Sequence, residues 1–224
     1  MEKHFLTELD SLKDHIIKMA TMVDDQVEMA FQALEDHDLN LSGIVKRTDR
    51  EIDAYDNLIQ TQTENLLALF QPVAIDLRFI ITAIMVNNQL ERCGDIAVNI
   101  AQRVKKTVDY KDLIAESQVL EMGKISRVMV KDAIDSFINR DTNLAKTVME
   151  RDDTVDALNK KAFNFLVEKM ENGPEYVKSG AHLLILSRHI ERLADHATNI
   201  AEDVVFMVDA RLMTHAKQFG LQEE

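Results

Sequence analysis

An internal repeat constrains this chain of 224 residues more than any other feature. The segment ERCGDIAVNIA (Glu91–Ala101) recurs as ERLADHATNIA (Glu191–Ala201), with identical residues at seven of the eleven positions. Upstream, DLNLSGIVKRTDREIDA (Asp38–Ala54) aligns with DTNLAKTVMERDDTVDA (Asp141–Ala157). The segments keep the same order in both halves, and their offsets of 100 and 103 residues differ by a length that one loop absorbs. The sequence therefore indicates a tandem duplication.

The composition predicts that each repeat is helical. Only 2 Pro and 6 Gly punctuate the chain, too few for the turns of a many-stranded fold. Hydrophobic residues make up 46%, which is enough for a core and excludes disorder. We therefore expect an all-α fold with six long helices, arranged as two tandem, pseudo-symmetric three-helix bundles over residues 1–112 and 113–224.

Local signals predict where the helices begin and end. The predicted helices of the first half cover residues 5–35, 38–69 and 72–108, and those of the second cover residues 117–139, 142–171 and 175–212. Asp38 or Asn40 is a candidate N-cap. Pro72 and Pro174 suit the first turn of a helix, and Gly173 suits the position just past one. A polar linker at residues 109–116 separates the halves.

The charge balance excludes several classes of partner. Asp and Glu number 39 against 26 Lys and Arg, which gives a net charge of −13. A chain this acidic is a poor ligand for nucleic acid and for anionic membrane surfaces. The single cysteine, Cys93, fits a reducing compartment. The N-terminus lacks the apolar region of a secretory signal, and no apolar run approaches the ~20 residues that span a bilayer. We therefore expect a cytoplasmic protein without membrane insertion.

Pairs of carboxylates four residues apart recur in both halves. In the third predicted helix, Leu90 and Cys93 lie on the core side, whereas Glu91 and Asp95 lie on the opposite side. The second predicted helix carries a matching pair that flanks Ile52. We expect the two pairs of each half to meet at a surface groove, as exposed ridges. The candidate metal ligands are Asp49, Asp53, Glu91, Asp95, Asp152, Asp156, Glu191 and Asp195.

The duplication of these pairs favours a bound cation. Like charges one helical turn apart destabilise a bare helix by a few tenths of a kcal/mol, so their retention in both copies suggests compensation by a metal ion. Oxygen ligands favour Mg, Mn, Ca or Fe, whereas Zn usually recruits His or Cys. The alternative is an ordinary solvated helix face.

Other chemistry-bearing residues favour structural roles. His182, His189 and His196 lie seven residues apart on one helix face, away from the acidic residues, which favours a packing or interface role over metal ligation. Cys93 lies on the core side and is predicted to be a small buried hydrophobe. The sequence contains no P-loop and neither a G-x-G-x-x-G nor a G-x-S-x-G motif.

Three motifs of this sequence resemble those of a known family. Q-P-x-x-x-D-L-R opens the third predicted helix at Gln71, E-R-x-x-D occurs in both halves, and R-x-x-E-R-x-x-D-x-x-x-N-I runs from Arg188 to Ile200. In their order and spacing, from about Met22 to Val208, they resemble PhoU, a family of regulators of phosphate transport and phosphate signalling in bacteria and archaea. The resemblance implies two similar three-helix bundles.

The resemblance also implies a function. PhoU-like proteins are not known as enzymes. The expected protein is a cytoplasmic negative regulator of phosphate uptake and of the phosphate-starvation response. Its expected partners are components of the phosphate ABC transporter, a sensor histidine kinase, and a second copy in a homodimer. The family's motif positions imply divalent, iron or zinc ions at the eight carboxylates, of an identity that the sequence leaves open. One position departs from the motif, where Gly94 is replaced by Ala194 in the second copy.

Three other interpretations compete with this one. The alternative function is a metal-dependent all-α phosphohydrolase that uses the D/E-x-x-x-D carboxylates. Such enzymes place carboxylates three residues apart inside a cleft, whereas the spacing here is four. Di-iron carboxylate chemistry requires E-x-x-H, which does not occur in the sequence. A continuous coiled coil conflicts with the breaks at Pro72 and Gly173.

Overall fold

The computed structural model describes residues 2–210, and within that range every regular element is helical. The elements are α1 (Glu2–Asp36), α2 (Leu39–Phe70), α3 (Ala74–Thr107), α4 (Lys111–Glu116), α5 (Val119–Asn139), α6 (Thr142–Asn172), the 3-10 turn η1 (Pro174–Tyr176) and α7 (Val177–Asp209). The predicted all-α class and the six long helices are confirmed. The short helix α4 replaces the predicted linker, and the predicted boundary at residues 112 and 113 falls inside it. The predicted helix end at Leu212 lies outside the described residues.

The second helix of each half begins at an aspartate N-cap. The Oδ1 atom of Asp38 accepts hydrogen bonds from the backbone N–H groups of Asn40 and Leu41, at 2.7 and 3.1 Å. Asp141 does the same at the start of α6, at 2.9 and 3.1 Å. Of the two candidate caps in the first half, Asp38 is therefore the one used, and the repeat preserves it.

The breaks before α3 and α7 differ from the prediction. Pro72 precedes α3, and the extended residue Val73 caps it, so the prediction that Pro72 lies in the first turn is wrong. The chain reverses at Gln71, whose φ of 50° is left-handed. In the second half Pro174 opens η1. Gly173 is the C-cap of α6, directly past the helix as predicted, and its φ of −155° is an extended conformation open to any residue.

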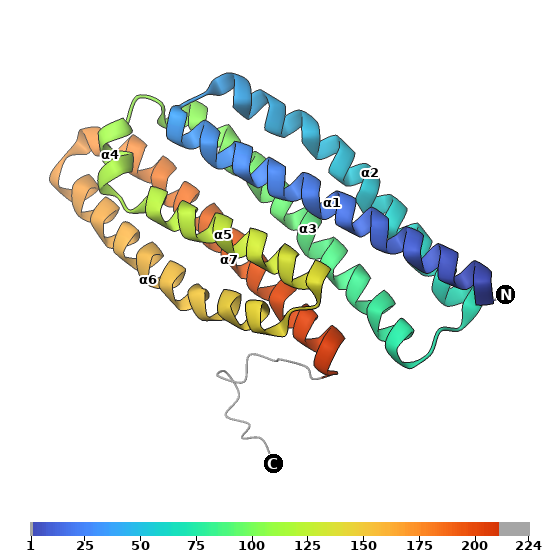
Figure 1. The fold of residues 1–224 in the computed structure, drawn as a ribbon. Helices are drawn as coiled ribbons and strands as arrows, with labels where there is room; N and C mark the ends of the chain where they lie inside the picture. The colour runs from blue at the N-terminus through green and yellow to red at the C-terminus, as the bar shows by residue number, and fades with distance from the viewer. Residues whose placement is uncertain (1, 211–224) are drawn as a thin grey trace, which may run out of the picture.

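The two bundles pack side by side through α3 and α7, as Figure 1 shows. The Nε atom of Arg78, near the start of α3, donates to the carbonyl oxygen of Met207, near the end of α7, at 3.0 Å. At the other end of the pair, Arg103 of α3 lies 3.4 Å from the ring of His182 of α7. The two helices are therefore antiparallel. The helices α2, α3, α7 and α6 follow one another across one face, which we call the four-helix face, and α1 and α5 meet on the other side.

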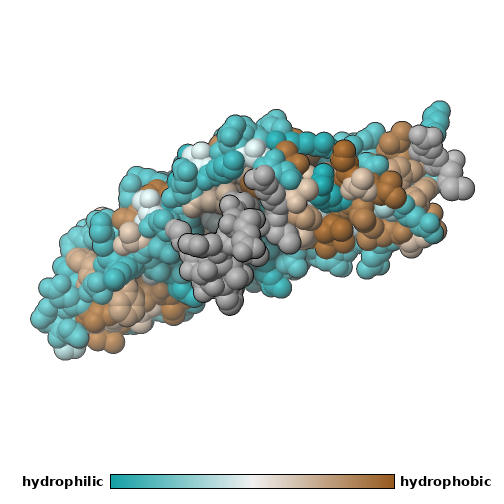
Figure 2. All heavy atoms as spheres, turned by 90° about the horizontal axis from the view of Figure 1, so that it is seen from below, coloured by the Kyte–Doolittle hydropathy of each residue, from teal (hydrophilic) through white to brown (hydrophobic). Residues whose placement is uncertain are grey.

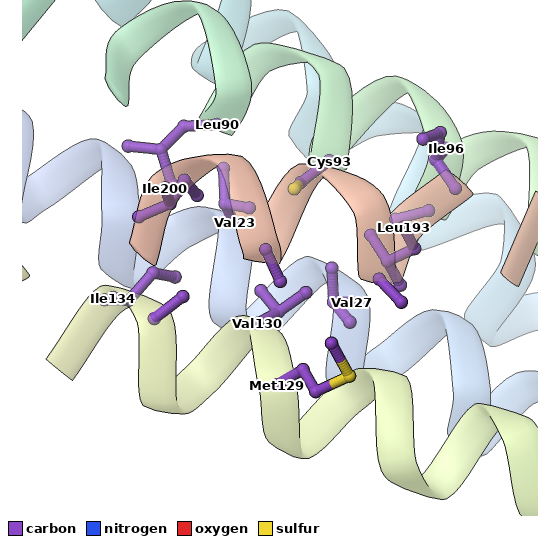
Figure 3. Close-up of a cluster of buried hydrophobic side chains, with 14 of the residues drawn as sticks. Val23, Val27, Leu90, Cys93, Ile96, Met129, Val130, Ile134, Leu193 and Ile200 are labelled. Carbon is purple, nitrogen blue, oxygen red and sulfur yellow. The ribbon is translucent and has the colours of Figure 1, made fainter. Parts of the chain in front are cut away.

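One continuous core joins the two bundles. Figure 3 shows its centre, where side chains of α1, α3, α5 and α7 meet. The predicted core positions of α3 and α7 are confirmed, because all of them are fully buried: Leu90, Cys93, Ala97, Ile100, Val104, Ile190, Leu193, Ala197, Ile200 and Val204. Among residues 2–210, no helix has both the length and the apolar character needed to cross a bilayer.

Candidate functional site

The structure groups the eight predicted carboxylates into two sets on the four-helix face. The first acidic quartet joins α2 to α3, and the second joins α6 to α7 in the equivalent position. We define the first acidic quartet as Asp49, Asp53, Glu91 and Asp95, and the second as Asp152, Asp156, Glu191 and Asp195. Within each quartet the carboxylates of one helix perturb those of the other electrostatically. The sequence had predicted this meeting of the two pairs in each half.

Asp49 anchors the first quartet against the protein interior. Burial raises the pKa of its carboxyl, a hydrogen bond from Gln26 opposes the rise, and the charges of Asp53 and Asp95 add to it. The Nε2 atom of Gln26 lies 3.2 Å from Oδ1 of Asp49 and 3.1 Å from the carbonyl oxygen of Val45. Gln26 is fully buried in α1. A side chain of α1 therefore holds Asp49 in place, although the sequence predicted a site formed by α2 and α3 alone.

Glu91 occupies the opposite wall of the same groove. Burial raises the pKa of its carboxyl, the charge of Asp95 adds to the rise, and Arg92 opposes it. The Nε atom of Arg92 lies 3.4 Å from Oε2 of Glu91, and its Nη1 atom lies 3.7 Å from Oδ2 of Asp95. In the structure one arginine therefore neutralises part of the charge of this wall.

Asp56 lies beside the first quartet and was not among the residues predicted from the sequence. Its Oδ1 atom accepts a hydrogen bond of 2.6 Å from the buried amide of Asn87, and its charge contributes to the raised pKa of Glu91. Its position, three residues after Asp53 on the same helix, was the available signal. The repeat did not reveal it, because the equivalent residue in the second half is Asn159.

The second quartet repeats this arrangement with different supporting residues. Burial raises the pKa of Asp152, the charges of Asp156 and Asp195 add to the rise, and the Thr198 hydroxyl opposes it. The opposing group in this quartet therefore comes from α7, whereas in the first quartet it is Gln26 of α1.

Glu191 is a partly buried carboxylate of the second quartet. Burial raises its pKa, the charge of Asp195 adds to the rise, and Arg188 opposes it. The Nη1 atom of Arg188 donates to Oε1 of Glu191 at 2.5 Å, and the Glu191 side chain is only 13% exposed.

The prediction that all these acids form exposed ridges is wrong for half of them. Asp49, Glu91, Asp152 and Glu191 are partly buried, whereas the other four are exposed. The reason is that α2 packs onto α3, and α6 onto α7, so closely that one carboxylate of each pair lies in the seam between the two helices. Each quartet therefore combines two partly buried acids with two exposed ones.

The donor chemistry of the quartets fits a hard cation, since every ligand is a carboxylate oxygen. Their arrangement fits less well, because across residues 2–210 no three His, Cys, Asp or Glu side chains converge on one point where a metal ion could lie. Arg92 and Arg188 hold Glu91 and Glu191 instead. An incoming ion would have to displace these arginines and turn the carboxylates toward a common centre.

The predicted packing role of the three histidines is confirmed. They lie on the side of α7 that contacts α3, where the Nδ1 atom of His196 is 2.7 Å from Oε1 of Gln89. Burial lowers the pKa of all three rings, and that of His196 falls to about 4. Cys93 is fully buried, and burial raises the pKa of its thiol to about 12, so it is an unreactive core residue.

These features define an all-α protein of two fused three-helix repeats with a carboxylate cluster on each. Two segments of the chain, residues 16–104 and 119–204, match the model of the PhoU domain. The chain therefore belongs to the PhoU family, as its motifs predicted.

Relatives and solved structures resemble the chain over nearly its whole length. It is 31% identical over 210 residues to the "Phosphate-specific transport system accessory protein PhoU homolog" of Clostridium acetobutylicum, covering 93% of this chain and 96% of the relative. It is 36% identical to the protein of the same name from Aquifex aeolicus, covering 93% and 94%. The crystal structure of PhoU from Pseudomonas aeruginosa superposes with a TM-score of 0.86 at 33% identity, covering 92% of this chain and 100% of that one.

Proposed function

We propose that this protein is a cytoplasmic negative regulator of phosphate uptake and of the phosphate-starvation response. It acts as an adaptor between the phosphate ABC transporter and a sensor histidine kinase. The observation that carries the proposal is the presence of two equivalent acidic quartets on one face of a protein whose relatives are named for phosphate-specific transport. Acidic faces steer and orient basic partner surfaces.

The mechanism follows from the duplication. Each quartet forms a docking surface for basic side chains, and the pseudo-two-fold relation lets one chain contact two equivalent partner subunits. The transporter then senses phosphate, and its conformational state determines how well its subunits bind the two acidic quartets. Self-association as a homodimer is part of the proposal and is checked by sedimentation equilibrium.

Binding to the purified ATP-binding subunit of the transporter tests the adaptor role. We expect Asp95→Asn/Asp195→Asn to weaken binding about tenfold or more. The affinity of this variant should also depend less on salt concentration than that of the wild type. The matched control, Asp25→Asn/Asp209→Asn, removes the same charge from exposed positions outside the quartets and should bind as the wild type does. Equal weakening in both variants would show that only net charge matters.

We also propose that the quartets bind divalent, iron or zinc ions, which compete with Arg92 and Arg188 for the carboxylates. Elemental analysis of the purified protein, beside Asp95→Ala/Asp195→Ala, tests this directly. We expect stoichiometric metal in the wild type and its loss in the variant. Absence of metal after incubation and desalting would leave the quartets as bare docking surfaces.

The adaptor proposal includes the absence of catalysis. The alternative, a metal-dependent phosphohydrolase, draws on the same carboxylates. A nucleotide-hydrolysis screen with Mg²⁺ or Mn²⁺ separates the two. We expect no turnover, and turnover that disappears in Asp95→Asn would replace the adaptor with the enzyme.

A further inference from the structure

Apolar side chains are exposed along the N-terminal half of α3, on the four-helix face. Ile81, Ile84 and Met85 are 39%, 36% and 36% exposed. Seven residues are nearly two helical turns, so Ile84 and Glu91 lie on the same side of α3. The first apolar strip (Ile81, Ile84, Met85) therefore leads directly into the first acidic quartet.

The second repeat has an equivalent strip on α7. Val177 and Ile185 are 50% and 40% exposed, and Val177 lies fourteen residues before Glu191, on the same side of the helix. Beside this second apolar strip, a groove of about 480 Å³ between α6 and α7 is lined by the 54% exposed Phe163 and by Arg188, among others. The apolar surface thus continues onto α6.

The antiparallel packing of α3 and α7 gives these features a two-fold layout. The contact between Gln89 and His196 places the two quartets level with each other near the middle of the face. The strips lie at opposite ends, because each precedes its quartet along helices that run in opposite directions. Along its length of about 40 Å, the face is therefore apolar at one end, acidic in the middle and apolar at the other end. Figure 2, which views the molecule from below rather than onto this face, shows hydrophobic side chains gathered toward the right-hand end, which holds the α2–α3 turn.

We infer that this face binds a two-fold-symmetric homodimeric protein that carries Lys and Arg side chains at its symmetry axis and apolar side chains on either side. The inference rests on the proposed adaptor function and specifies the partner surface. Exposed apolar surface beside a charged rim marks a protein-binding site. A symmetric partner can bind both halves of the face at the same time, since each of its subunits contacts one strip and one quartet.

Charge excludes the other occupants of the face. If a second copy of this chain docked here, the eight carboxylates of its two quartets would face the same eight carboxylates of the first copy. The arginines beside the quartets are too few to neutralise this charge. Anionic lipid headgroups would meet the same carboxylates. A basic protein surface is the occupant whose charge is complementary.

A synthetic probe tests the surface independently of the natural partner. The probe is a helical peptide of about five turns, with leucines on one face and lysines near one end, joined through that end to a second copy. We expect the linked pair to bind at least about tenfold more tightly than the single peptide, because both halves of the face are engaged together. A glutamate version of the linked pair should not bind.

Three double variants locate the binding. Ile81→Ser/Met85→Ser and Val177→Ser/Ile185→Ser each remove one strip and should reduce binding of the linked pair to that of the single peptide. The matched control, Ile17→Ser/Val128→Ser, changes side chains of 38% and 42% exposure on α1 and α5 and should bind as the wild type does. Circular dichroism verifies that each variant is folded.

Several results would overturn the inference. The first is that the linked and single peptides bind equally well, and the second is that the wild type binds neither. The third is that the control variant weakens peptide binding as much as the strip variants do. Dissociation of a wild-type dimer by the strip variants would assign the face to a second copy. Binding to phosphatidylglycerol vesicles that the strip variants abolish would assign it to a membrane.

The transporter subunit distinguishes failure of this inference from failure of the proposed function. If the strip variants weaken peptide binding but the wild type does not bind the ATP-binding subunit, the adaptor function fails and the surface stands. If the subunit binds the wild type and both strip variants equally, the surface assignment fails and the adaptor function stands.

Discussion

Asp203 lies in α7 with only 7% of its surface exposed, and burial raises the pKa of its carboxyl from 3.8 to about 7, with a smaller contribution from Glu202. The folded protein therefore holds this proton more tightly than the unfolded chain does. The resulting stabilisation is full below pH 3.8 and is lost as the pH rises through 7. Three pKa units correspond to about 4 kcal/mol at most.

We expect Asp203→Asn to raise the free energy of unfolding at pH 8.5, where the wild type carries a buried charge. The gain should reach a few kcal/mol and shrink at pH 5. Urea unfolding at the two pH values measures it. Asp209→Asn, an exposed position on the same helix, is the control and should change little. A gain of equal size at both pH values would contradict the titration argument.

Two glycines in helices have opposite surroundings. A Cβ atom added at Gly123 would lie 2.6 Å from Cε1 of Phe31, whereas one added at Gly43 would meet nothing nearer than Arg47 at 3.7 Å. We expect Gly123→Ala to lower the free energy of unfolding by about 1–3 kcal/mol through overpacking. Gly43→Ala should raise it by about 0.5–1 kcal/mol through helix propensity. Chemical denaturation compares the pair, and equal effects would contradict the packing argument.

At the scale of the helices, the equivalent caps of α2 and α6 offer an internal comparison. Removing Asp38 or Asp141 by substitution with Ala leaves two backbone N–H groups of the first turn without their carboxylate acceptor. We expect each variant to lose about 1 kcal/mol of stability. Urea unfolding measures the loss, and Asp36→Ala, at the last position of α1, is the control. A loss in only one repeat would show that the two caps are not equivalent.

The helices themselves could be predicted, because hydrophobic periodicity, caps and a repeated order of motifs are local signals. The core stripes of α3 and α7 followed from spacing alone. The support of the acidic site could not be predicted. Gln26 reaches Asp49 from another helix, and Asn87 reaches Asp56, so both contacts depend on how helices pack. The same packing partly buries Glu91, which periodicity placed on an exposed side.

At the scale of the whole molecule, the seam between α3 and α7 is sensitive to acid. Burial, with Arg192 and Arg92 adding to it, lowers the pKa of His196 from 6.5 to about 4. The unfolded chain therefore takes up this proton first. The corresponding stability is present above pH 6.5 and is lost as the pH falls toward 4, by up to about 3 kcal/mol.

We expect His196→Gln, which keeps a polar side chain beside Gln89, to lose less stability than the wild type between pH 7 and pH 4.5. Urea unfolding across this range measures the difference. His4→Gln, which changes an exposed ring in α1, is the control. Parallel pH profiles for wild type and His196→Gln would contradict the argument.

The shared core has a consequence for the two repeats as separate polypeptides. A cut within residues 109–116 would leave each half with a wide apolar side, formed by α1 and α3 in one and by α5 and α7 in the other. Neither half on its own could bury that apolar side. The separated halves should remain soluble only as a non-covalent pair, each completing the hydrophobic interior of the other, and this would make the chain a natural scaffold for split-protein reconstitution.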